Sequence, residues 1–162
     1  MSDAPEVILT PGEMHVAATI GCLRQIENLG KRRSDAHGAP RDGGWQIHIE
    51  GAAGEAAVAK WLGRYWNGAL GDLDADDVGT VQVRTTSRTD GCLILHDSDL
   101  DDRPFVLVTG VAPSFVLRGW IWARDGKRKE HWRDPVGGRG AYFVPQSALR
   151  PMRRSTKGQV DA

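Results

Sequence analysis

Between Gly51 and Arg84 the apolar residues change from a helical period to strict alternation, and this change restricts the fold more than any other feature of the chain. At 100° per residue, one helix face gathers apolar residues around the carboxylate of Glu55, namely Ala52, Val58, Ala59, Leu62 and Trp66. The pattern predicts a helix over about residues 49–67, before Gly68. A carboxylate on a buried stripe costs free energy unless it is paired, hydrogen-bonded or bound to a metal. Glu55 is therefore the first candidate site residue.

A polar strand face follows this helix. An acidic loop over residues 71–79 comes first, with the carboxylates of Asp72, Asp74, Asp76 and Asp77. Beyond the loop, polar and mostly apolar positions alternate, with Thr80, Gln82 and Arg84 on one side and Val81, Val83 and Thr85 on the other. We expect Gln82 and Arg84 to lie beside Glu55, just after Asp77.

The remaining signals define the order of the elements. Thr10 and Glu13 form a capping box around Pro11, which predicts a first helix that ends at Gly30 and buries Leu23 and Ile26. Further strands are predicted over Cys92–His96, Phe105–Thr109, Phe115–Trp122 and Ala141–Val144, with a short helix over Pro145–Leu149. Helices followed by strands predict a single α/β or α+β domain over residues 1–150, with helices on at least one face of a sheet. Residues 31–44 are expected to form a mobile loop, and residues 151–162 a flexible basic tail.

Composition excludes several classes of protein. The 162 residues include 21 basic and 21 acidic side chains, so the net charge of zero argues against a uniformly basic coat for nucleic acid and leaves room for a local basic groove. Cys22 and Cys92 form no CxxC pair, which argues against a disulfide framework or a zinc site. The chain has neither an apolar run of membrane-spanning length nor a signal-peptide pattern, so we expect a cytoplasmic protein without a membrane partner.

The candidate residues together suit phosphodiester chemistry. Carboxylate and amide oxygens, as offered by Glu55, Asp77 and Gln82, are ligands for Mg²⁺ or Mn²⁺. Such a metal activates a bound water, and a cation such as Arg84 stabilises negative charge on a phosphate under attack. A calcium loop beginning at Asp72 fails, because Asp77 takes its sixth position instead of glycine and Val83 its twelfth instead of glutamate.

The segment Gly51-Ala-Ala-Gly-Glu55, followed by Asp77-Val-Gly-Thr-Val-Gln82-Val-Arg84-Thr-Thr86, resembles the PD-(D/E)XK nuclease superfamily. The resemblance covers roughly Glu50 to Thr109 and implies a restriction-endonuclease-like fold, which is a mixed sheet flanked by helices. It implies Mg²⁺ held by Asp77 and Gln82 with help from Glu55, and Arg84 as the residue that positions water and stabilises the transition state. Nucleic acid is the expected partner, with DNA favoured over RNA, and the choice of substrate between them stays open. The family normally has an acidic residue where this chain has Gln82 and a lysine where it has Arg84. The compact, Trp-rich and Gly-rich chain also resembles small phage or prophage proteins.

Four alternatives stay open at this point. Two concern the site: Glu55 could pair with Arg84 in a purely structural role, and Asp72, Asp74 or Asp76 could be the metal ligand in place of Asp77. Two concern the function: the fold could have lost cleavage and serve as a nucleic-acid-binding module, or the chain could be an accessory or inhibitor that binds another protein through exposed aromatic residues and acidic loops.

Overall fold

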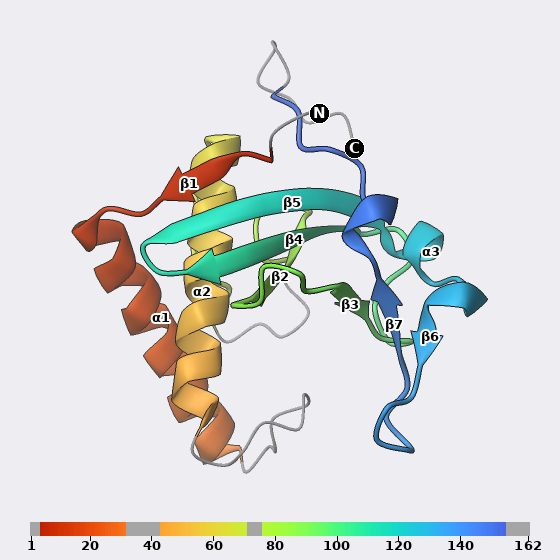
Figure 1. The fold of residues 1–162 in the computed structure, drawn as a ribbon. Coiled ribbons are helices and arrows are strands. Elements are labelled where there is room, and N and C mark those ends of the chain that lie inside the picture. Colours follow the sequence, from red (N-terminus) through yellow and green to blue (C-terminus); the bar gives the residue numbers. More distant parts are fainter. Residues whose placement is uncertain (1–3, 32–42, 71–75, 155–162) are drawn as a thin grey trace.

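The computed structural model describes residues 4–31, 43–70 and 76–154, which form three layers (Figure 1). Two long helices, α1 (Pro11–Gly30) and α2 (Gly44–Leu62), make the first layer. The second is a four-stranded sheet in the order β1 (Glu6–Ile8), β5 (Ser114–Trp122), β4 (Pro104–Val111) and β2 (Gln82–Thr86). The third is a smaller sheet in the order β3 (Leu93–Leu95), β7 (Ala141–Val144) and β6 (Trp132–Arg133), next to the short helix α3 (Ala123–Gly126). Two 3-10 turns, Lys129–His131 and Gln146–Ala148, complete the description.

The larger sheet is mixed, and β2 lies at its edge. β2 runs parallel to β4, whereas β4–β5 and β5–β1 are antiparallel. The prediction of an α/β domain with a mixed sheet flanked by helices is therefore confirmed, as are the five predicted strands. Strands β1 and β6 and helix α3 were not predicted, because two to four residues are too few to show a period.

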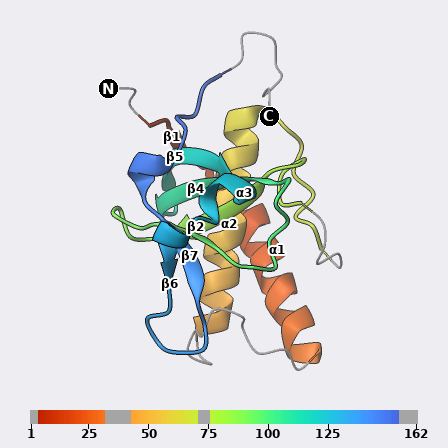
Figure 2. The same cartoon turned by 90° about the vertical axis from the view of Figure 1, so that its right-hand side faces the viewer.

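The two faces of the larger sheet bury separate cores. The alanines of α2 pack on Val83, Val106 and Val108 on one face. On the other face, Phe105 and Leu107 pack on Leu93 and Leu95 of β3. Figures 1 and 2 show the consequence, since α1 and α2 lie on one side of the sheet and the β6–β7 pair extends from the other.

Helix α1 begins as predicted but buries a different face. Thr10 Oγ1 accepts the Glu13 N–H, and the Glu13 carboxylate accepts the Thr10 N–H, as the capping box requires. The predicted burial of Leu23 and Ile26 is wrong, because they are 41% and 54% exposed. The buried side consists instead of Ala17, Gly21 and Gln25. A Cβ atom on Gly21 would lie 2.5 Å from the Ile49 Cα atom, so small residues permit a close crossing of α1 and α2.

Helix α2 is shifted towards the N-terminus relative to its prediction. It begins at Gly44 rather than near residue 49 and ends at Leu62 rather than Trp66. Gly63 ends the helix in the left-handed conformation, with φ 63° and ψ 33°. The sequence prediction ran past this glycine because apolar residues follow it. Ala52, Val58 and Ala59 are buried as predicted, but so is every other residue from Ala52 to Ala59, so burial surrounds this part of the helix instead of following one stripe.

Gly54 sets the distance between α2 and β2, which gives a test of the packing. A Cβ atom there would lie 1.9 Å from Thr85 Oγ1, so Gly54→Ala should lower the free energy of unfolding by about 1–3 kcal/mol through overpacking. Gly51→Ala, in the same helix, meets nothing within 4 Å and should instead stabilise the protein by about 0.5–1 kcal/mol through helix propensity. Urea denaturation of both variants checks this, and equal effects would contradict the close approach.

Several predicted features fall on residues that the structure does not describe. These are most of the loop predicted over 31–44, Asp72 and Asp74 of the acidic loop, and residues 155–162 of the tail. At the start of the tail, Met152 packs against the core and Arg154 lies over the Trp61 ring. Within the described parts of the chain, no helix is long and apolar enough to cross a membrane.

Candidate active site at the edge of the sheet

Glu55 forms a buried ion pair with a residue of α1. Arg24 Nη1 and Nη2 donate to the two Glu55 carboxylate oxygens, each at 2.7 Å, and Trp66 Nε1 donates to Oε2 at 3.1 Å. The side chains of Arg24 and Glu55 are 19% and 6% exposed. Burial alone would lower the pKa of Arg24, but the hydrogen bonds and charge of Glu55 outweigh it and raise that pKa above its usual value. Glu55 is thus satisfied by Arg24, and the pairing with Arg84 that we considered is not formed.

Sequence analysis missed Arg24 because it placed the core-facing side of α1 on the large apolar residues. Arg24 also donates to the Gly68 carbonyl oxygen, from Nη2 at 2.6 Å and from Nε at 3.2 Å. It therefore ties α1 to α2 and to the turn after α2. The small residues Ala17 and Gly21, spaced four apart, were the signal for this packing face.

Asp77 lies at the free edge of β2, and its environment opposes ionisation. Its Oδ2 accepts the Val83 N–H at 2.7 Å, a group on the side of the strand that β4 does not use. Burial, followed by the negative charge of Glu55, raises the pKa of Asp77 to about 7 against the opposing effects of the Val83 N–H, Arg84 and Arg24. The negative charge of Glu55 therefore adds to burial in opposing ionisation of Asp77.

Gln82 and Arg84 share a strand face, but it is the face turned away from α2. Val83 packs in the core below α2, and Thr85 meets Gly54 of that helix. Arg84 lies instead over the Phe105 ring, 4.8 Å from its centroid, in the core on the opposite side. The expectation that Glu55 lies beside Gln82 and Arg84 is thus corrected, and the candidate residues surround the edge of β2 from both faces.

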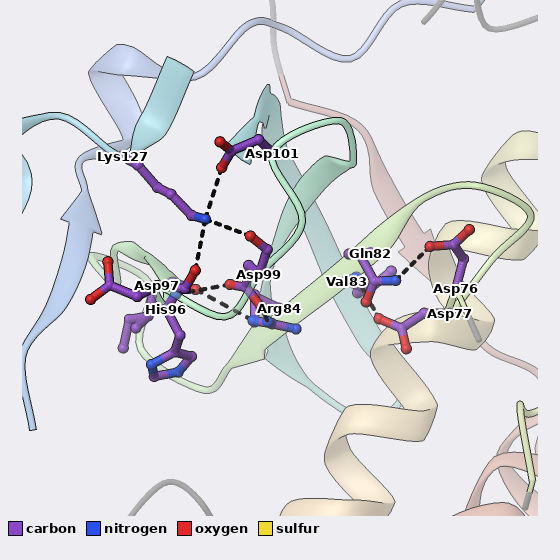
Figure 3. Close-up of polar contacts among 11 residues, drawn as sticks. Asp76, Asp77, Gln82, Val83, Arg84, His96, Asp97, Asp99, Asp101 and Lys127 are labelled. Carbon is purple, nitrogen blue, oxygen red and sulfur yellow. Dashed lines mark hydrogen bonds and ion pairs between the residues drawn. The ribbon is translucent and has the colours of Figure 1, made fainter. Parts of the chain in front are cut away.

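Neighbouring carboxylates hold both side chains (Figure 3). Gln82 Nε2 donates to Asp76 Oδ1 at 2.8 Å, and Arg103 Nε donates to the same oxygen at 2.9 Å. Arg84 Nη2 donates to Asp99 Oδ1 at 2.9 Å, and Arg84 Nε donates to the Ile94 carbonyl oxygen at 3.3 Å. All three partners belong to loops, namely Asp76, Asp99 and Arg103. The sequence did not predict Asp99 and Arg103 as site residues, and it offered Asp76 only as an alternative metal ligand.

Lys127 holds the loop that carries Asp99. Its ammonium group donates to the carbonyl oxygens of Asp97 and Asp99 and to the Asp101 carboxylate (Figure 3). Asp99 Oδ2 also accepts the His96 N–H at 2.9 Å. A single cation thus fixes the loop whose carboxylate positions Arg84.

The donor set fits Mg²⁺ only as a weak site. Among the residues that the structure describes, no three His, Cys, Asp or Glu side chains converge as a metal cage. Mg²⁺ commonly needs only one or two carboxylates, because water and substrate phosphate complete its shell. Asp77 Oδ1 and the Gln82 amide oxygen make no hydrogen bond within the described structure, whereas both Glu55 oxygens are occupied. Asp77 and Gln82 are therefore the available ligands, and Glu55 contributes its charge.

Comparison with known proteins identifies no relative of this chain. No protein-family model, curated protein or solved structure matches the chain.

Proposed function

We propose that the protein hydrolyses phosphodiester bonds of nucleic acid with Mg²⁺ or Mn²⁺ at the edge of β2. The observation that carries this proposal is that Asp77 Oδ1 and the Gln82 amide oxygen, at the free edge of β2, make no hydrogen bond within the described residues, while Arg84 shares a strand face with Gln82. Burial and the charge of Glu55 raise the pKa of Asp77, so a divalent cation bound at Asp77 would relieve the unfavourable negative charge there. Glu55 contributes charge only, because Arg24 and Trp66 occupy both of its oxygens.

Each residue has a role in this proposal. Asp77 supplies a charged oxygen to the metal and Gln82 a neutral one, since its amide nitrogen is already engaged by Asp76. When bound, the metal supplies an activated water and a positive charge at the phosphate. Arg84 stabilises negative charge on the phosphate, and Asp99 positions its guanidinium group. Arg24 holds Glu55 in place.

A second candidate function is binding of nucleic acid without cleavage. The observation in its favour is the complete pairing of Glu55 with Arg24 and Trp66, which leaves one carboxylate for a metal. With either function we propose nucleic acid as the partner, with DNA favoured over RNA, and the cytoplasm as the location. For the third candidate, a protein-binding accessory, the structure shows exposed aromatic side chains, since Tyr65 is 91% exposed and Trp45 and Trp132 are 42% and 39% exposed, while its acidic loop is described only from Asp76 onwards.

Loss of Asp77 separates the two functions. With Mn²⁺, the wild-type protein should nick labelled DNA, and Asp77→Ala should reduce the rate at least about a hundredfold through loss of a metal ligand. Glu130→Ala, which removes an exposed carboxylate 3.9 Å from Arg128, is the control and should leave cleavage within about threefold. Binding without cleavage by the wild-type protein, across DNA and RNA, would favour the second function.

Gln82→Glu tests the metal site directly. The new carboxylate faces Asp76 and loses the hydrogen bond from Nε2, so in EDTA the variant should melt at a lower temperature than the wild-type protein. The added charge strengthens the metal site, so the rise in melting temperature on adding Mn²⁺ should be larger in the variant. Calorimetry with and without Mn²⁺ checks both effects. An equal Mn²⁺ response in the two proteins would count against metal at Gln82.

A further inference from the structure

A cavity of about 490 Å³ lies beside Arg84, between the first part of α2, β2 and the smaller sheet. Its volume is within the range of sites that enclose a small ligand, about 300–1,000 Å³. Its lining combines two cationic side chains, Arg84 and Arg88, and one acidic side chain, Asp90, with Thr86 and the apolar side chains of Ile47, Leu107 and Phe143.

The two arginines have capacity for an anion. Arg84 uses Nη2 and Nε for Asp99 and Ile94, and Nη1 makes no hydrogen bond to any residue in the described ranges. Among the described residues, the Arg88 side chain pairs with Asp90 alone, at 3.3 Å, and both side chains are about three-quarters exposed at 74% and 75%. An exposed pair of this kind contributes little free energy, so Arg88 can exchange Asp90 for a phosphate at small cost. Arginine is suited to this exchange because its planar fork matches phosphate oxygens.

The apolar wall suits the other half of a nucleotide. Phe143 offers an aromatic ring, and Ile47 and Leu107 are branched aliphatic side chains. Any base can stack on an aromatic ring such as that of Phe143, because every base has a flat π-face. A base inside an intact duplex is stacked on its neighbours on both faces, so it can lie against Phe143 only if it is flipped out of the stack.

We propose that this cavity binds one unpaired nucleotide, with its phosphate at Arg84 and Arg88 and its base against Phe143. This inference rests on the proposed function and specifies its substrate, which is a single strand or an unpaired end rather than continuous duplex. A free nucleotide has the same chemistry, so the test must separate the two sources.

Binding to three probes separates them. Asp77→Asn protein is titrated, with fluorescence anisotropy as the readout, against a labelled oligothymidylate of about 15 nucleotides and a labelled dumbbell duplex that has no ends. Thymidine monophosphate is the competitor. The single strand should bind at least about tenfold more tightly than the dumbbell, and the mononucleotide should compete only at much higher concentration. Equal affinity for strand and dumbbell would overturn the proposal.

Matched variants locate the bound nucleotide. Arg88→Gln should weaken strand binding about three- to tenfold, whereas Arg128→Gln, at an exposed arginine outside the cavity lining, should have little effect. Cys92 lines the cavity and Cys22 lies on α1, and both are free thiols. Attachment of a bulky maleimide to Cys92 in a Cys22→Ser protein should abolish strand binding, and attachment to Cys22 in a Cys92→Ser protein should not. If Arg88→Gln binds like Arg128→Gln, the cavity is not the site, whether or not Cys92 reacts.

Failure of this inference differs from failure of the proposed function. Asp77-dependent cleavage of the dumbbell would keep the nuclease and overturn the nucleotide cavity. Strand binding that is sensitive to Arg88, without cleavage by the wild-type protein, would keep the cavity and overturn the nuclease. Binding of thymidine monophosphate as tight as that of the strand would assign the cavity to a free nucleotide and overturn the single-strand substrate.

Discussion

Replacing Arg24 by methionine should lower the free energy of unfolding by about 3–5 kcal/mol, since it leaves the charge of Glu55 buried without its cation. Methionine keeps much of the length of the side chain, so the lost packing is small. The Gly68 carbonyl oxygen also loses its donor. Urea denaturation at neutral pH measures the effect.

Two further variants show that the charge is the cause. Arg24→Met combined with Glu55→Leu removes both charges and should recover most of the lost stability, because an apolar pair of similar volume is often as stable as a buried ion pair. Lys60→Met removes the exposed pair with Glu13 and should cost at most about 1 kcal/mol. If Arg24→Met costs no more than Lys60→Met, Glu55 is not held by Arg24 in solution.

Local patterns predicted the elements and the need of Glu55 for a partner, but not which partner it has. The helical period placed Glu55 on the buried stripe, and it is 5% exposed. Its partner lies 31 residues away on α1, brought there by a helix crossing at Gly21. A crossing is set by the fit of two surfaces, which the period of one helix does not contain.

The side chains of β2 show the same limit of local patterns. Alternation correctly places Gln82 and Arg84 on one side of β2 and Val83 on the other. It does not say which side meets α2, and the structure turns the apolar side towards the helix because the alanine-rich stripe must be covered. The contacts of Asp99 and Lys127 depend on loop conformation and have no periodic signal at all.

The stability of the protein should depend on pH through Asp77. Burial and the charge of Glu55 raise the pKa of Asp77 from its usual 3.8 to about 7. Between these values the folded protein holds a proton that the unfolded chain releases, so the free energy of unfolding falls as pH rises from about 4 to 7 and levels off above. The displacement corresponds to a loss of up to about 4 kcal/mol.

Asp77→Asn isolates this contribution. The asparagine side-chain oxygen can still accept the Val83 N–H, but the side chain does not ionise. In EDTA, the variant should therefore be the more stable protein at pH 8, with an advantage that shrinks as pH falls towards 5. All other titrating groups, including the five histidines, occur in both proteins and largely cancel in the difference. Denaturation at several pH values measures the difference curve. A flat curve would mean that Asp77 ionises as freely in the folded protein as in the unfolded chain, and the carboxylate pair that supports a metal site would then lose its electrostatic basis.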